Sequence, residues 1–448
     1  MKIKRLDTYR MVIDNTCWVF VTVTAEDGRV GWGEATDSCD DSGLAHLIAG
    51  LNQVLAGRDP EDILSCTQEY WDWCYPIRRA IRTYATAWSA VDQALWDLNA
   101  QAKGLPLYQL LGGRKADRVR LYANLNNALR KDRRPERLAE NGKKALEAGF
   151  QMLKCTPFDR VRPNWFDVDI EEGLRRVEAL TEHVSLDKVA VDCHQRFVPH
   201  TLGRVVEALL QRYGCSPYWL EDPVDIADYD SVRIMRERYP QIRWAAGEDA
   251  LNLAALFKTM CSGCYEVLMP DVKFMGGVSA IRALIPMAEE SGFAVSPHNP
   301  NGPISTAHSA HLVTLCRKDV PLEYPFASVP GREYMVTPNE VVEGGYYALP
   351  QSPGLGVSIT QEALREYGSH FVQQPSGLFV GFYCICKCRL LRVLYDRIKF
   401  RILLFDSFED GRLIMLCLDP VKGHSPMRCL ILTEERILSV QYIVHGVN

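Results

Sequence analysis

The chain has 448 residues, 47% of them hydrophobic, which is enough for a globular protein with a sizeable core. Its 51 basic and 56 acidic residues leave a net charge near −5, which argues against a nucleic-acid-binding protein and against a protein of the membrane surface. The 15 cysteines show no repeating spacing, as is typical of a large protein in a reducing compartment, so we expect a cytoplasmic protein.

Residues 1–114 are predicted to form an α+β capping domain. The first residues interleave charged and apolar side chains, which indicates a strand and not the apolar core of a signal peptide. The run CWVFVTVTAEDGRVGWGEA at 17–35 predicts a hairpin that turns at residues 26–28. Over residues 41–111 apolar side chains recur at three- and four-residue steps, which predicts helices.

Residues 115–372 are predicted to form a modified (β/α)8 barrel. Short apolar runs alternate here with helical segments, which is typical of βαβ units and a parallel sheet. An open doubly wound sheet is the alternative, but no glycine-rich phosphate loop follows the first strand. The carboxyl ends of barrel strands meet at one mouth, so the polar residues that end six runs should surround one pocket. These residues, at intervals of about 23 to 29 residues, are Asp192, Glu221, Glu248, Asp271, His298 and Glu323.

Residues 373–448 are interpreted as an appended apolar and basic extension, to which we assign no function. Its apolar run at 377–386 is far shorter than the roughly twenty residues of a membrane helix, so no membrane partner is expected. Three cysteines, Cys384, Cys386 and Cys388, have the spacing to hold a soft metal, but no partner ligands lie nearby in the sequence. A separate pair, Cys261 and Cys264, lacks a second pair at zinc spacing and is interpreted as ordinary thiols.

Three carboxylates on successive predicted strands indicate a metal site. Asp192, Glu221 and Glu248 would repel one another at the barrel mouth unless a cation neutralised them. No cysteine or histidine has the spacing of a zinc partner, so one Mg²⁺ ion with open positions for water and substrate oxygens is expected. The alternative is that these carboxylates form salt bridges with neighbouring arginine and lysine side chains.

Asp271 and His298 end the next two runs and predict a general base. An aspartate that accepts a hydrogen bond from the imidazole fixes its tautomer and raises its basicity. Lys273 leaves the same side of the predicted strand as Asp271, so it can pair with that carboxylate and compete with His298 for it. A structural role for His298, ahead of a proline-rich loop, is the alternative.

The ordered set of these residues resembles the enolase superfamily, mandelate racemase subgroup, over roughly residues 1–370. The helix motif AVDQALWDL at 90–98 comes first and the segment PGLGVSITQEAL at 353–364 comes last. The resemblance implies an α+β cap over a modified barrel, an Mg²⁺-assisted removal of a proton alpha to a carboxylate, and a homo-oligomer. The motif residues between these segments are Lys154, Asp192, Glu221-Asp222-Pro223, Gly247-Glu248, Asp271 with Gly276-Gly277, His298 and Glu323.

The resemblance also implies residue roles. Asp192, Glu221 and Glu248 match the family's metal ligands, and His298 with Asp271 matches its base dyad. Glu323 matches the residue that hydrogen-bonds the substrate carboxylate. Lys154 matches the first lysine of the family's Lys-x-Lys motif, whereas Thr156 stands where racemases keep a second base.

The sequence position of His194 indicates the kind of reaction to expect. In galactonate dehydratase-like members of the family, a histidine two residues after the first metal ligand is the general acid, and His194 has this place after Asp192. On a strand, two side chains at this spacing would share a face. The resemblance therefore implies a hydro-lyase that dehydrates a sugar acid, an aldonate or aldarate, to a 2-keto-3-deoxy acid through an enediolate.

Substrate contacts and two alternatives complete the interpretation. Asn124 and Lys273 are candidate substrate-binding residues, while the cap-loop residues Asp37, Asp40 and Asp41 are interpreted as solvated turn residues. An epimerase or cycloisomerase with a lysine opposite His298 is one alternative. A non-catalytic barrel whose extension binds a partner is the other.

Overall fold

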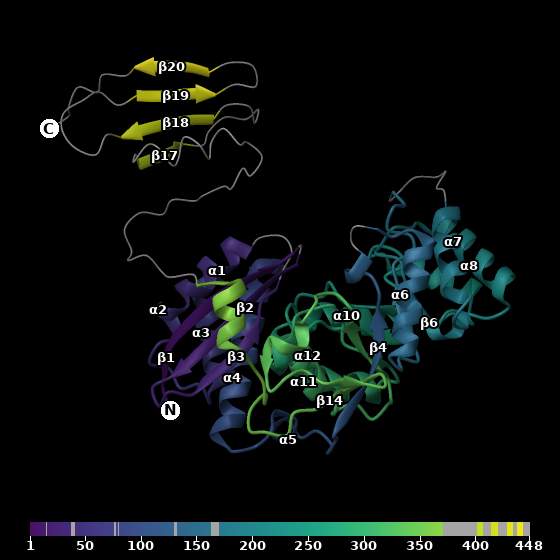
Figure 1. Ribbon diagram of the computed structural model, residues 1–448, viewed down its shortest axis with the longest axis horizontal. Helices are drawn as coiled ribbons and strands as arrows, with labels where there is room; N and C mark the ends of the chain where they lie inside the picture. Colours follow the sequence, from purple (N-terminus) through teal and green to yellow (C-terminus); the bar gives the residue numbers. More distant parts are fainter. Residues whose placement is uncertain are drawn as a thin grey trace. The chain divides into compact units, whose positions relative to one another are not determined.

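The computed structural model describes residues 1–14, 16–36, 41–75, 78, 80–129, 132–162 and 170–370, and four strands beyond them. The chain divides into two compact units, Met1–Val372 and Gln373–Asn448 (Figure 1). The first unit contains every candidate site residue that the sequence indicates outside the extension. Asp37 and Asp40 lie outside the described residues, and Asp41 is the first residue of helix α1 (Asp41–Gly50).

The cap combines an antiparallel sheet with helices. Its strands have the order β16-β1-β2-β3, and the predicted hairpin joins β2 to β3. Helix α4 packs on β2 and β3, and also contacts α11 of the barrel (Figure 1). The elements are β1 (Ile3–Ile13), β2 (Thr16–Ala25), β3 (Val30–Glu34), β16 (Gly368–His370), α1, α2 (Asn52–Leu55), α3 (Ile63–Cys74), α4 (Arg82–Ala102) and α5 (Leu107–Leu111).

Glycines in β3 allow this strand to lie directly on α4. A Cβ atom at Gly33 would lie 2.0 Å from the carbonyl oxygen of Ala90, and one at Gly31 would lie 2.0 Å from that of Ala94. Real Cβ atoms do not approach backbone oxygens so closely, so any larger residue would push the strand away from the helix. The close contact fixes the end of β3, from which Glu34 reaches the barrel.

Eight parallel strands form the barrel. Each strand from β4 to β9 pairs with the next one in the chain, and β11 pairs with β4, so the sheet returns to its first strand. The pairing of the last strand with the first is the one that a barrel requires, so the described strands agree with the barrel prediction. The strands are β4 (Arg118–Asn124), β5 (Leu153–Cys155), β6 (Val189–Asp192), β7 (Trp219–Glu221), β8 (Trp244–Ala246), β9 (Val267–Leu268), β10 (Ala294–Val295) and β11 (Leu322–Pro325).

Seven helices follow the first seven strands. They are α6 (Pro135–Glu147), α7 (Glu171–Thr181), α8 (Pro199–Tyr213), α9 (Tyr229–Arg238), α10 (Leu253–Ser262), α11 (Gly277–Glu290) and α12 (Pro303–Val313). After β11, the described chain forms short strands and then α13 (Gln361–Tyr367), which packs on β1 of the cap. The barrel is therefore modified at its eighth position, where the chain returns to the cap. The short strands are β12 (Val336–Thr337), β13 (Val342–Glu343), β14 (Tyr346–Ala348) and β15 (Ser358–Ile359).

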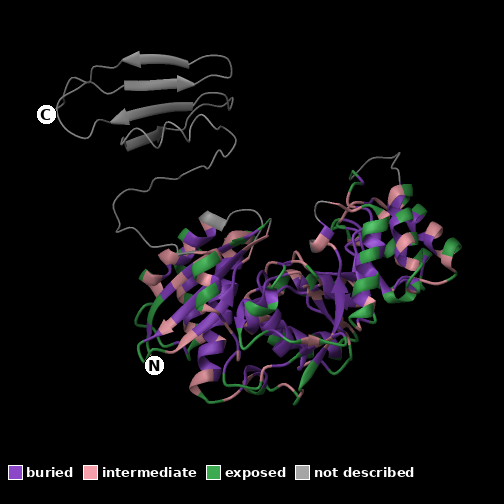
Figure 2. Cartoon of the chain, in the orientation of Figure 1, coloured by how far each residue is buried: buried purple, intermediate pink, exposed green. Residues whose placement is uncertain are grey.

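Apolar side chains fill the barrel beneath the mouth. Tyr122, Ala190 and Trp219 belong to one buried cluster, and the Tyr122 and Trp219 rings meet edge to face at 5.5 Å. Successive side chains of a strand alternate between its faces, so the residue two positions further on shares the interior. Asn124, Asp192 and Glu221 have these positions and are buried. Figure 2 shows how the buried residues are distributed over the chain. The interior below the mouth is thus packed with apolar and aromatic side chains, while the mouth itself is polar.

The second unit contains a four-stranded antiparallel sheet in the order β17-β18-β19-β20. Its strands are β17 (Arg401–Phe405), β18 (Ile414–Asp419), β19 (Arg428–Leu432) and β20 (Ile437–Gln441). The run 377–386 and the cysteines Cys384, Cys386 and Cys388 lie outside the described residues. Within the described part of the chain, no helix combines the length and apolar character needed to cross a membrane.

Candidate active site

Three carboxylates from successive strands meet at the barrel mouth. Asp192 is the last residue of β6, Glu221 is the last of β7, and Glu248 follows β8 by two residues. One oxygen of each lies within 4.8 Å of the others. Asp192 and Glu221 are fully buried, and the Glu248 side chain is 15% exposed. Burial raises the pKa of Glu221 to about 8 against the opposing charge of Lys154, which shows how poorly this spot tolerates a further negative charge.

Lys154 of β5 lies among these carboxylates. Its Nζ atom is 3.2 Å from Asp192 Oδ2, 3.2 Å from Glu323 Oε1, and in contact with Glu221 Oε1. Burial opposes the charge on this lysine, but the three carboxylates outweigh it and raise the pKa of Lys154. Because Lys154 is surrounded by acceptors, it acts as a fixed positive charge at the mouth.

All the atoms through which the carboxylate cluster could bind a metal ion are oxygens. Asp192 Oδ2 and Glu248 Oε2 are buried and have no hydrogen-bond partner among the described residues, although each lies near a cationic group. Hard divalent cations prefer such carboxylate oxygens, whereas zinc and other soft metals prefer nitrogen and sulfur. The residues present therefore fit a hard divalent cation.

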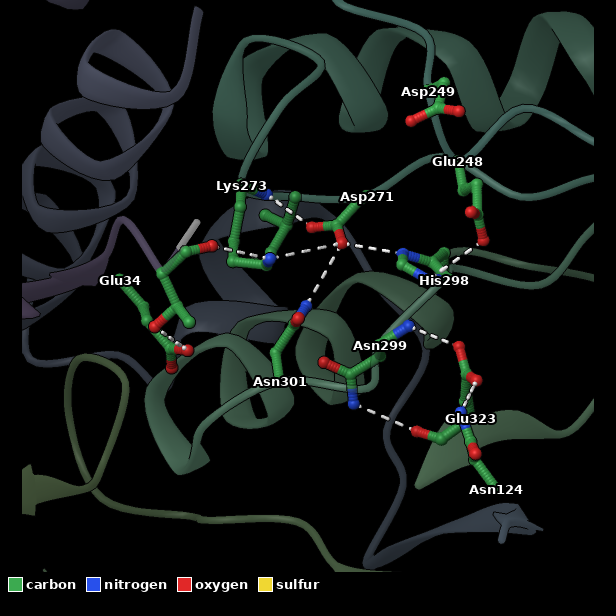
Figure 3. A network of polar contacts seen from close by, with 12 residues as sticks. Glu34, Asn124, Glu248, Asp249, Asp271, Lys273, His298, Asn299, Asn301 and Glu323 are labelled. Carbon is green, nitrogen blue, oxygen red and sulfur yellow. Dashed lines mark hydrogen bonds and ion pairs between the residues drawn. The ribbon is translucent and has the colours of Figure 1, made fainter. Parts of the chain in front are cut away.

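His298 and Asp271 form the pair that the sequence predicts. Nδ1 of His298 lies 2.8 Å from Oδ2 of Asp271, and Nε2 lies 3.0 Å from Oε2 of Glu248 (Figure 3). Burial disfavours the charged imidazole, but Glu248 and Asp271 outweigh it and raise the pKa of His298. The Asp271 contact holds Nδ1, so Nε2 is the atom directed at the carboxylate cluster.

Asp271 is itself held on both oxygens. The backbone N–H of Lys273 donates to Oδ1 at 2.8 Å, and Nδ2 of Asn301 donates to Oδ2 at 3.1 Å. The Lys273 ammonium lies 3.6 Å from Oδ2, as the sequence-based alternative supposed, but it also donates to the carbonyl oxygen of Thr36 in the cap at 2.8 Å. Lys273 and His298 therefore share Asp271 instead of excluding each other.

Glu323, the second residue of β11, closes the ring and so does not end its strand as the sequence predicted. Its Oε1 accepts from Asn124 Nδ2 at 2.6 Å, and its Oε2 accepts from the backbone N–H of Asn299 at 2.6 Å. Asn124 ends β4, which pairs with β11, so the side chains of the first and last strands meet here. Asn124 was predicted to contact substrate hydroxyls; in this arrangement it orients Glu323.

His194 reaches the carboxylate cluster from a turn. Strand β6 ends at Asp192, and His194 follows with a φ of 46°, in the left-handed region, so strand alternation is not what brings the two residues together. The backbone N–H of His194 donates to Asp192 Oδ1 at 3.0 Å, and its Nε2 lies 3.1 Å from Oδ2. Asp192 raises the pKa of His194 to about 9 despite partial burial. The imidazole is 38% exposed, and so it can face both solvent and cluster.

Asp222 forms a second acidic group with Glu248 and Asp249. Both Asp222 oxygens are buried without a hydrogen-bond partner among the described residues, and burial raises the pKa of this carboxyl well above its usual range. Asp249 is compensated by Arg82 at 2.8 Å and Gln195 at 2.9 Å. The first cluster differs in that its oxygens face Lys154 and both histidines.

The sequence-based prediction missed the residues that support the base dyad. Asn299 and Asn301 lie in the loop PHNPNGP after His298, and Glu34 comes from the cap. The density of asparagine and proline in that loop was a signal for a rigid turn, but nothing in the sequence connected it to Glu34. Elsewhere, Cys261 is exposed, while the buried Cys264 donates its thiol to the carbonyl oxygen of Tyr229 at 3.3 Å.

A parallel barrel whose mouth carries a carboxylate cluster and carboxylate-bound histidines defines a barrel enzyme with acid–base chemistry. A sequence model described as "Enolase C-terminal domain-like" matches residues 137–363. A model of the mandelate racemase / muconate lactonizing enzyme N-terminal domain matches residues 5–112. The chain therefore belongs to the enolase superfamily, in its mandelate racemase subgroup, and the predicted resemblance is confirmed.

The chain is similar over most of its length to proteins with named activities. It is 30% identical to the D-gluconate dehydratase of Thermoproteus tenax over 81% of this chain and 71% of that one. It is 28% identical to the D-galactonate dehydratase of Verminephrobacter eiseniae over 82% of this chain and 94% of that one. A crystal structure of an enolase from Agrobacterium radiobacter, with sodium and L-malate bound, is 27% identical, has a TM-score of 0.71, and covers 84% of this chain and 97% of that one.

Proposed function

We propose that the protein is a hydro-lyase, an Mg²⁺-dependent dehydratase of an aldonate or aldarate. One observation carries this proposal: two imidazoles, from the loops that follow β6 and β10, contact the same carboxylate cluster. Nε2 of His298 lies 3.0 Å from Glu248, and Nε2 of His194 lies 3.1 Å from Asp192. One histidine to remove a proton and a second to supply one is the arrangement that elimination of water needs. The sugar-acid dehydratases among the relatives support the same class of reaction.

Asp192, Glu221 and Glu248 would hold the Mg²⁺ ion. When bound, the ion would neutralise these carboxylates and stabilise negative charge on the substrate carboxylate. The carboxylate oxygens of the cluster suit this ion, and Lys154 supplies a further fixed positive charge beside them.

His298 removes the proton alpha to the substrate carboxylate. Asp271 holds the Nδ1 side of the imidazole, which leaves Nε2 as the accepting atom. The carboxylate thereby becomes an enediolate, whose added negative charge is stabilised by the fixed positive charge of Lys154. Glu323 would lie beside the substrate carboxylate, and Asn124 and Asn299 hold both of its oxygens in place.

His194 completes the elimination. It donates a proton to the beta hydroxyl as the C–O bond breaks, so the hydroxyl leaves as water and the electron pair of the enediolate forms the double bond of an enol. The enol then becomes the 2-keto-3-deoxy acid by tautomerisation. The proton taken by His298 and the proton given by His194 balance over one turnover.

The lysine contacts speak against an epimerase or cycloisomerase. A two-base mechanism needs a neutral base opposite His298, but the Lys154 ammonium contacts three carboxylates and the Lys273 ammonium contacts Thr36 and Asp271. Thr156, at the position of the second lysine of the racemases, has no basic group. The full acid–base set likewise speaks against a non-catalytic barrel.

The test is a panel of aldonates and aldarates incubated with Mg²⁺ in D₂O and followed by proton NMR and a keto-acid assay. We expect a keto acid from one or a few substrates, and its loss in both His298→Asn and His194→Asn. The exposed His183 provides the matched control, since His183→Asn should retain full activity. Deuterium at the alpha position without loss of water would instead establish the epimerase and remove the acid role of His194.

A further inference from the structure

The end of cap strand β3 is joined to the base dyad by polar contacts. Nζ of Lys273 donates to the carbonyl oxygen of Thr36 at 2.8 Å and lies 3.6 Å from Oδ2 of Asp271 (Figure 3). Thr36 comes two residues after the end of β3, and Asp271 is the residue that orients His298. A single ammonium group thus contacts both the cap and the dyad.

A second set of hydrogen bonds joins the end of β3 to the base dyad. Thr36 Oγ1 donates to Glu34 Oε1 at 2.7 Å, and Glu34 accepts from the backbone N–H groups of Gly302 and Ser305 at 2.8 and 2.9 Å. These N–H groups belong to the start of α12, where a carboxylate is favoured by the helix dipole. Asn301, adjacent to Gly302, donates to Oδ2 of Asp271. The contacts form a closed ring that begins and ends at Asp271.

The ring is tightly enclosed. Glu34, Asp271 and Lys273 are buried, with Lys273 only 4% exposed. A Cβ atom at Gly302 would lie 2.7 Å from the Glu34 carboxylate oxygens, so the absence of a side chain there lets the carboxylate reach the helix. Buried charged groups of this kind are costly unless each has partners, and here each one does.

The ammonium group of Lys273 is surrounded by other groups of the protein. A carbonyl oxygen, a carboxylate oxygen and the ring of Phe274, whose centre is 4.0 Å away, lie around the ammonium group. The first of these contacts is a hydrogen bond, the second is an ion pair at 3.6 Å, and the third is a cation–π contact. These contacts favour a role inside the protein over the substrate contact suggested by the sequence.

We propose that Lys273 is a positioning residue through which the cap sets the orientation of the Asp271–His298 base. The inference deepens the proposed function and rests on it for its kinetic test. Removing the ammonium group takes away the charge beside Asp271 and the donor to Thr36 together. Asp271 is then held less firmly, and a small displacement of a general base lowers the rate of proton transfer without changing the affinity for substrate.

The kinetic test compares Lys273→Met with Lys258→Met in the Mg²⁺-loaded enzyme. Lys258 is exposed on α10 and provides the matched control. We expect Lys273→Met to lower kcat about 10- to 100-fold while KM stays within about threefold. We expect Lys273→Arg, which keeps the charge and the donors, to recover part of kcat. Unchanged kcat in Lys273→Met, or a raised KM with unchanged kcat as for a substrate contact, would overturn the proposal.

A second readout separates this proposal from the proposed function. If the wild-type protein converts no sugar acid, the proposed function fails, and hydrogen–deuterium exchange of the full chain decides about Lys273. In Lys273→Met we then expect at least about tenfold faster exchange in residues 31–36 and 299–306, with β6 and β7 unchanged. Equal protection of these segments in Lys273→Met, Lys258→Met and wild type would show that Lys273 does not join the cap to the dyad.

Discussion

The two halves of the site reach the barrel mouth in different ways. Asp192 and Glu221 end strands that pair with each other, so the sheet alone sets their spacing. Asp271 and His298 lie in loops beyond β9 and β10. Lys273, which contacts Asp271, and Gly302, which follows Asn301, are hydrogen-bonded to cap residues more than 230 positions away in sequence. The carboxylate half is thus set by the sheet, and the dyad half depends on the cap, so metal binding and proton removal should be separable.

The largest effect is expected from Asp192→Asn. Loss of this carboxylate would remove a proposed metal ligand and the partner of His194, so we expect keto-acid formation to fall more than about 1000-fold, equivalent to about 4 kcal/mol. Calorimetric titration with Mg²⁺ should show weakened binding in the same variant. Asp187→Asn, at an exposed position before the same strand, is the control. Wild-type Mg²⁺ affinity in Asp192→Asn would remove Asp192 from the ligand set.

Asp271→Asn tests the dyad half. The amide cannot accept the Nδ1 hydrogen bond in the same way, so we expect kcat to fall about 100-fold while Mg²⁺ affinity stays within about twofold. Steady-state kinetics and Mg²⁺ titration together measure the separation. The control is Asp230→Asn, whose carboxylate is highly exposed on α9. Equal losses of Mg²⁺ binding and turnover would contradict the division of the site into two halves.

Gly33→Ala tests the dependence of the dyad on the cap. The new Cβ atom would meet the carbonyl oxygen of Ala90, so we expect the free energy of unfolding to fall by about 3 kcal/mol. The displaced end of β3 should lower turnover more than Mg²⁺ affinity. Gly50→Ala, where the new atom meets only ordinary contacts from Trp73, should be neutral or slightly stabilising. Thermal unfolding, kinetics and Mg²⁺ titration check the three quantities.

The buried His308, which joins the barrel to cap strand β3, leads us to expect that the protein is less stable in acid. Its Nε2 pairs with the carbonyl oxygen of Trp32 at 2.9 Å, and burial lowers its pKa to about 3. The unfolded chain takes up a proton on this residue below about pH 6.5 while the folded protein does not, so stability is lost as pH falls. The loss reaches about 2 kcal/mol at pH 5, from about 1.4 kcal/mol per pH unit.

The measurement is urea unfolding at pH 7.5 and 5.0. His308→Gln should reduce the loss between these values by about 2 kcal/mol, whereas His183→Gln, at an exposed position, should leave it unchanged. Burial raises the pKa of Asp92 to about 7 and that of Asp97 to about 6, so these two groups make the folded protein more stable as pH falls. We therefore compare the loss of stability in His308→Gln with the loss in wild type, because both proteins contain the two aspartates. A loss that is identical in wild type and His308→Gln would contradict the prediction.

Strand periodicity explains why the carboxylate half could be predicted. An apolar run that ends in a carboxylate, repeated at one strand-plus-helix interval, requires only that the runs become neighbouring barrel strands. Asp192, Glu221 and Glu248 meet that condition, and Glu323 returns beside Asn124 because β11 pairs with β4. The fold class followed from the same pattern, whereas the superfamily was predicted from the resemblance of the ordered motif residues.

The dyad half could be predicted only in part. His298 and Asp271 meet as expected, but the sequence does not show whether Lys273 points to substrate, to Asp271 or to the cap. That choice depends on the packing of β3 against α4 and α12, which brings Glu34 to a helix start 268 positions away. The turn at His194 is another local choice that strand alternation could not supply, since the strand ends at Asp192.

The pairing of β16 with β1 gives the cap a particular order of assembly. Tyr9 lies opposite His370, so the cap sheet begins in the first residues of the chain and is completed only after every barrel strand has been synthesised. Until then β1 has a free edge, and free strand edges promote association with other chains. During translation, the newly made cap is therefore the part of this unit most in need of protection, and the barrel must be finished before that edge is covered.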